Sequence, residues 1–166
     1  MAFYGFLRGG EFSTHSDSFN PSHDLTISDV SIFSHHFTIF LKHSKTDRNR
    51  EGSFVYVSET NSAFCPQSSI LAYLRSRPQA HLEDPLFTTE EGKPMSRAWF
   101  ASRFRLLCQY CGLPPECYSA HSLRIGAATT AASSTPVSTL KAMGRWSSPA
   151  TRAILEAQKA MLVICS

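Results

Sequence analysis

The stretch His121-Ser122-Leu123-Arg124, followed by Gly144-Arg145-Trp146, carries the most information in this sequence. A histidine and an arginine three residues apart can share one face of a helix. Two short pieces precede them, Leu7-Arg8-Gly9-Gly10-Glu11 at the start of the chain and Ser44-Lys45-Thr46-Asp47 in the middle. Guanidinium groups stay charged, and their planar forks match pairs of phosphate oxygens. Arg8 and Arg124 therefore predict a clamp for a phosphate group.

An arginine, a lysine, a histidine, a second arginine and a tryptophan, in this order, resemble the active-site set of the tyrosine recombinase (phage integrase-type) family. Three segments, Gly5-Phe-Leu-Arg8, residues 118–129 and residues 140–148, look most like the corresponding sequences of recombinases from Crypton- or DIRS-type mobile elements. The resemblance runs from the first residues to about Trp146. It implies an α+β fold, a mostly helical catalytic domain with a small three-stranded antiparallel sheet.

The resemblance also gives each residue of the set a role. Arg8 and Arg124 would clamp the scissile phosphate and stabilise the charge that develops on it. Lys45, on a polar hairpin loop, would be the general acid that protonates the leaving 5′-oxygen. His121 would contact the phosphate or handle the proton of the nucleophile, and Trp146 would donate its indole N–H to a phosphate oxygen.

Two further residues lie close to members of this set. Glu11 follows Arg8 by three residues, and the equivalent carboxylate of the family supports the active site, so we expect Glu11 to orient Arg8. Lys42 competes with Lys45 for the role of general acid, but its neighbours Phe40 and Leu41 belong to the body of a predicted strand. We therefore prefer Lys45.

One member of the family's set is missing. The family usually places its nucleophilic tyrosine eight or nine residues after the His/Trp position, and here Ile154 and Leu155 occupy those places. Neither side chain can form a phosphoester bond. We therefore expect a DNA breaking-rejoining domain that is itself inactive, or a non-catalytic DNA-binding remnant of a mobile element. The sequence after about residue 149 is unlike the family, so true loss and a truncated or mis-spliced gene model both stay open.

A third interpretation is a zinc-dependent interaction module. Cys108, Cys111, Cys117 and His121 have the ligand types and spacing of a Cys3His zinc site. However, Cys108 and Cys111 also continue the apolar stripe of a predicted helix that contains Trp99, and cysteine packs well as a small hydrophobic residue. We prefer the packing interpretation and expect no metal and no other cofactor.

The periodicity of apolar residues predicts the order of elements. We expect a buried helix over residues 2–8 that stops at Gly9-Gly10, and a loop over 13–24. Three β-rich segments and a series of helices follow. The strands are predicted at 25–32, 36–42 and 53–58, and the helices from about Pro66 to Arg77, from Ser96 to Cys111, at 121–133, from Pro136 to Gly144 and from Pro149 onward.

Composition fits one domain over residues 1–166. The chain has 42% hydrophobic and 17% charged residues and a formal net charge of +3, which is ordinary for a globular protein and compatible with a nucleic-acid partner. Five cysteines do not suggest a disulfide scaffold. We expect an intracellular, nuclear protein, truncated at its N-terminus, that binds double-stranded DNA as a homo-oligomer, with no membrane and no small-molecule substrate.

Overall fold

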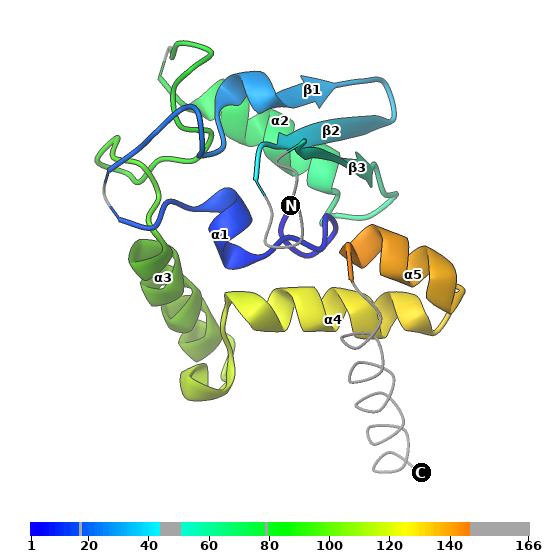
Figure 1. Ribbon diagram of the computed structural model, residues 1–166. Helices are drawn as coiled ribbons and strands as arrows, with labels where there is room; N and C mark the ends of the chain where they lie inside the picture. Colours follow the sequence, from blue (N-terminus) through cyan, green and yellow to red (C-terminus); the bar gives the residue numbers. More distant parts are fainter. Residues whose placement is uncertain (17, 44–50, 79, 147–166) are drawn as a thin grey trace.

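The computed structural model describes residues 1–16, 18–43, 51–78 and 80–146. Within these ranges the chain forms one three-stranded antiparallel sheet and a set of helices (Figure 1), which confirms the predicted α+β class. In chain order the elements are α1 (Gly9–Phe12), the 3-10 helix η1 (Ile27–Asp29), β1 (Val30–Ile32), β2 (His36–Leu41), β3 (Ser53–Ser58), α2 (Pro66–Ser76), α3 (Arg97–Tyr110), the 3-10 helix η2 (Pro115–Cys117), α4 (Ala120–Ala132) and α5 (Val137–Gly144).

The sheet has the order β1-β2-β3, with Ile39 of β2 opposite both Val30 and Val55. Alternate residues of β2 and β3 point into the core, as the period of two predicts. The first strand is shorter than predicted, because residues 27–29 form η1 instead. The Asp29 carboxylate accepts a hydrogen bond from the Thr26 N–H at 2.7 Å, which closes this turn.

Helices α3, α4 and α5 lie below the sheet in Figure 1, with α4 running under the N-terminal segment and α1, whereas α2 packs against the sheet at β3. Leu7 and Phe12 pack with the buried residues of the sheet in one core cluster, and a second cluster joins Phe6 to α4 and α5. Helix α3 is capped as predicted, since the Ser96 hydroxyl accepts a hydrogen bond from the Trp99 N–H. No helix in the described ranges is long and apolar enough to span a bilayer.

The predicted helix over residues 2–8 is wrong. This segment is a succession of turns, and Phe6 has a φ of 51°, in the left-handed region that a right-handed helix excludes. Phe6 and Leu7 are both buried, but they enter different core clusters. The short helix α1 begins at Gly9, where we had predicted a stop. The N-terminal segment therefore links the sheet to the helical layer.

Candidate phosphate-binding site

Arg124 lies at the centre of the predicted site and is only 2% exposed. Its Nη1 donates to the Phe6 carbonyl and its Nη2 to the Gly144 carbonyl, so one side chain on α4 joins the N-terminal segment to the end of α5. Its guanidinium also lies over the Trp146 ring, 5.0 Å from the ring centroid. The left-handed conformation of Phe6 is part of the geometry that brings its carbonyl to the arginine.

Glu11 is held between two arginines. Its Oε1 accepts a hydrogen bond from Arg8 Nη1 at 3.0 Å, and its Oε2 accepts one from Arg145 Nη2 at 2.7 Å. The Arg8 backbone N–H also donates to Oε2, at 2.8 Å, so the carboxylate caps the start of α1. The side chain of Glu11 is 4% exposed, that of Arg145 13% and that of Arg8 25%. Arg8 is therefore the most accessible of the three charged groups.

Sequence reasoning missed Arg145. It follows α5 as its C-cap, with a φ of 50° that turns the chain and directs the guanidinium toward Glu11. The residue stood inside the Gly144-Arg145-Trp146 motif, but a left-handed conformation at a non-glycine residue gives no signal in the sequence. The site therefore contains one arginine more than predicted.

The charges of the group formed by Arg8, Glu11, Arg124 and Arg145 do not balance. Burial lowers the pKa of the Arg124 guanidinium to about 10, repulsion by Arg8 and Arg145 adds to this, and the Glu11 carboxylate opposes it. Burial also lowers the pKa of Arg145. Both groups still carry a proton at pH 7. Three cations around one carboxylate leave two positive charges that no described residue of this group compensates, and a bound anion is the ordinary way to offset such a charge.

Trp146 packs at the edge of this group of charged residues. Its ring lies edge-on to Phe6, with centroids 5.9 Å apart, and covers Arg124. A Cβ built on Gly144 would lie 2.2 Å from the Trp146 ring, so only glycine allows the ring to lie this close. The indole is therefore fixed by the residue two positions before it.

Gly144→Ala tests this packing. Alanine gains about 1 kcal/mol of helix propensity over glycine, but overpacking of a filled site costs about 1–3 kcal/mol. We expect the clash to dominate, so that the variant melts at a lower temperature and the fluorescence of Trp146 shifts in a Trp99→Phe background. An unchanged spectrum and melting temperature would show that Trp146 does not lie against Gly144.

His121 lies in the first turn of α4, one turn before Arg124, and its side chain is exposed. The neighbouring Ala120 approaches α1 closely, since a Cβ on Gly9 would lie 3.2 Å from the Ala120 Cβ. The start of α4 therefore lies beside the segment that carries Arg8. In α1, a Cβ on Gly10 would overlap the guanidinium of Arg97. A fourth arginine, from α3, therefore packs against α1.

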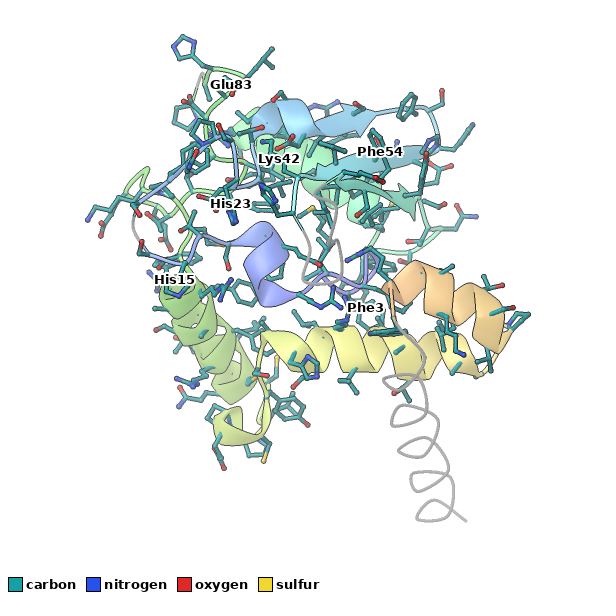
Figure 2. All side chains as sticks on the ribbon, viewed as in Figure 1. Phe3, His15, His23, Lys42, Phe54 and Glu83 are labelled. Carbon is teal, nitrogen blue, oxygen red and sulfur yellow. The ribbon has the colours of Figure 1, made fainter. Side chains whose placement is uncertain are left out.

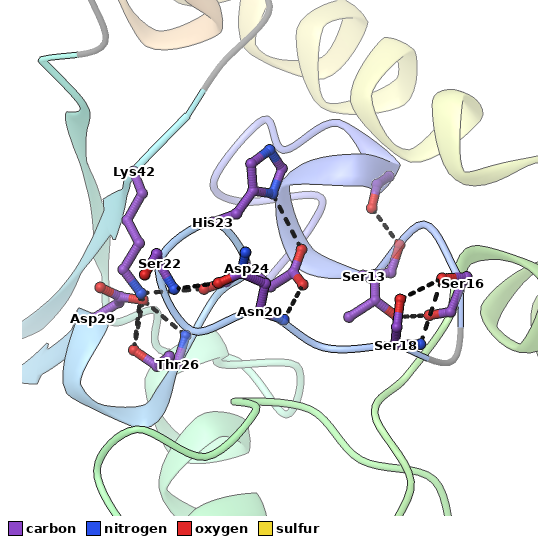
Figure 3. Close-up of polar contacts among 12 residues, drawn as sticks. Ser13, Ser16, Ser18, Asn20, Ser22, His23, Asp24, Thr26, Asp29 and Lys42 are labelled. Atoms are coloured by element: carbon purple, nitrogen blue, oxygen red, sulfur yellow. Dashed lines mark hydrogen bonds and ion pairs between the residues drawn. The ribbon is translucent and has the colours of Figure 1, made fainter.

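Lys45 lies outside the described residues, and its predicted role stays a prediction. The structure does place its competitor, Lys42, which is fixed by other contacts (Figure 3). Its Nζ lies 2.5 Å from Asp29 Oδ2 and 3.1 Å from both the Thr26 hydroxyl and the Asp24 carbonyl. These contacts hold the ammonium of Lys42 at the η1 turn.

The predicted zinc alternative finds no support. No cluster of three or more metal-ligating side chains occurs in the described part of the chain. Cys108 is buried in α3, whereas Cys111 and Cys117 are exposed. Leu107, next to Cys108 in α3, is 57% exposed, and with Cys111 also exposed the predicted apolar stripe is only partly core. Ile154 and Leu155, at the expected places of the nucleophile, also fall outside the described residues.

Solved structures of similar fold are DNA complexes. One is the XerH site-specific recombinase bound to its palindromic difH substrate, with a TM-score of 0.67 and 19% identity over 97% of this chain and 41% of that chain. Another is the Tn1549 transposon integrase in complex with transposon right-end DNA, with a TM-score of 0.54 and 14% identity over 99% of this chain and 57% of that chain. No family model and no curated protein matches the sequence. The chain thus shares the fold of these site-specific recombinases and spans 41% and 57% of the two chains.

Proposed function

We propose that this chain is a tyrosine recombinase-type domain that binds double-stranded DNA by its phosphate backbone. The observation that carries the proposal is the excess positive charge of Arg8, Arg124 and Arg145 around the single carboxylate of Glu11. Arg8 is one-quarter exposed and keeps donors for an incoming phosphate, while Arg124 and Arg145 add charge from beneath it. The shared fold with DNA-bound recombinases supports DNA as the source of that phosphate.

The direct test is binding to a duplex oligonucleotide at several salt concentrations. Each phosphate that the protein neutralises releases counterions, so about two to three such contacts should lower the affinity by about 10- to 40-fold between 50 and 200 mM salt. Fluorescence anisotropy with a labelled duplex of arbitrary sequence measures this slope. Binding that does not change with salt, or no binding at low salt, would contradict the proposal.

We further propose that the chain does not cleave DNA, because Ile154 and Leu155 stand where the family places tyrosine. In the family the tyrosine attacks the phosphorus in line with the leaving oxygen, and neither aliphatic side chain can do so. A nicked duplex that traps the covalent protein–DNA adduct provides the test, and we expect no adduct that survives denaturant. An adduct would contradict this, and mapping it would identify a substitute nucleophile.

The finer assignment to mobile elements of the Crypton or DIRS type rests on the motifs around Arg8, Arg124 and Trp146 alone. We propose a nuclear location and assembly as a homo-oligomer on DNA, both of which follow from that assignment. The test of assembly is the mass of the protein measured alone and in complex with DNA. The DNA is a duplex that contains two inverted copies of a sequence that the protein binds. A single protein on such a duplex at saturation would contradict it.

A further inference from the structure

A cavity of about 180 Å³ lies between the N-terminal segment, β3 and α5. Its lining includes Phe54 and Tyr56 of β3, which are 59% and 69% exposed, and Phe6, Met143 and Arg145 on the other sides. Phe54 lies beside the strands of the sheet (Figure 2). Phe40 of β2 supports it, since their ring centroids lie 5.0 Å apart. The cavity is therefore open to solvent beside two aromatic rings on a rigid strand.

One wall of this cavity is polar. Arg145 contributes its guanidinium, whose Nη2 is bound to Glu11 at 2.7 Å. Its Nε is buried and has no hydrogen-bond partner in the described part of the protein. Buried donors are nearly always paired, and one that is not paired indicates a missing partner. The cavity thus combines flat apolar surfaces with the guanidinium of Arg145.

We propose that this cavity takes one unstacked nucleobase of the bound DNA. Bases stack on aromatic side chains, and their carbonyl and ring-nitrogen acceptors pair with arginine. The size agrees, because a cavity of about 150 Å³ already holds a benzene ring. The inference rests on the proposed function for its ligand. Arg145 joins the cavity to Glu11 and Arg8, so the site that holds a phosphate adjoins the site that holds a base.

An experiment with two matched duplexes distinguishes binding of a base in the cavity from binding of the phosphate backbone alone. One contains a single extrahelical adenine, and the other has an abasic residue at the same bulge. We expect the wild-type protein to bind the adenine bulge about tenfold more tightly at constant salt, since stacking on an aromatic side chain contributes on this scale. Tyr56→Ala should abolish this preference and leave binding of a fully paired duplex unchanged.

Two control variants make the result specific. Tyr56→Phe keeps the ring and should keep the preference. Phe64→Ala removes a ring that is 80% exposed and does not line the cavity, and it should also leave the preference intact. Equal affinity of the wild type for the two bulges, or a preference that survives Tyr56→Ala, would overturn the base site while the proposed function stands.

If neither duplex binds, the proposed function fails, and a second readout decides the cavity separately. Titration with deoxyadenosine monophosphate, followed by the NMR signal of the Met143 methyl group, reports on occupancy without DNA. Met143 lines the cavity and is 43% exposed, so a stacked base should shift its resonance. A saturable shift that Tyr56→Ala removes would support the base site, and no shift would overturn it.

Discussion

Arg124→Ala should destabilise the domain by about 3–5 kcal/mol, the range seen when one partner of a buried charged network is removed. The substitution leaves the Gly144 carbonyl without its donor and the Phe6 carbonyl with only the long contact from Arg145 Nη2, at 3.5 Å. Each buried unsatisfied group costs about 1–3 kcal/mol. It also removes the cation that Trp146 covers. Urea denaturation followed by far-UV circular dichroism measures the change in the free energy of unfolding.

Arg124→Lys is the informative companion, because it keeps the charge but cannot donate to two carbonyls on opposite sides. We expect it to recover only part of the lost stability. Arg103→Ala is a matched control, since this arginine is 52% exposed and should change the free energy of unfolding by no more than about 0.5 kcal/mol. A loss below about 1 kcal/mol for Arg124→Ala would show that the buried contacts are not structural.

The fold was predictable where side-chain periodicity decides the structure. Alternation over residues 36–42 puts Phe37, Ile39 and Leu41 on one face, and all three are buried. The serine at position 96 marks the start of α3. The failure at residues 2–8 has a local cause. The spacing of apolar residues fits a helix, but the chain instead adopts a left-handed turn at Phe6, because the core cluster of α4 and α5 and two arginines hold that residue.

The site was predictable to the extent that its members stand in recognisable motifs. Arg8 and Glu11 interact as expected, and Arg124 and Trp146 lie in contact although they come from different elements. The burial of Arg124 was not predictable. Sequence indicated a direct phosphate clamp, whereas the structure engages both of its Nη atoms with carbonyls, so that it also holds the site together. Such a contact depends on the tertiary position of two backbone oxygens, which no local pattern encodes.

Arg8→Ala should have the opposite profile to Arg124→Ala, with a large effect on DNA binding and a small one on stability. Arg8 is the most accessible cation of the site, and Arg145 still neutralises Glu11 when Arg8 is gone. A charge-assisted hydrogen bond contributes about 1.5–3 kcal/mol, which corresponds to a loss of affinity of about 10- to 100-fold. The slope of log affinity against log salt concentration should decrease in magnitude by about one, because one phosphate contact is lost.

Anisotropy titrations of the wild type, Arg8→Ala and Arg103→Ala at three salt concentrations separate a specific contact from general charge. Arg103→Ala removes the same unit of charge from an exposed position of α3, paired with Glu90, and should weaken binding by less than about threefold. Equal losses for the two variants would mean that Arg8 acts only through net charge. A larger loss for Arg8→Ala, at unchanged stability, would identify Arg8 as the residue that contacts the phosphate.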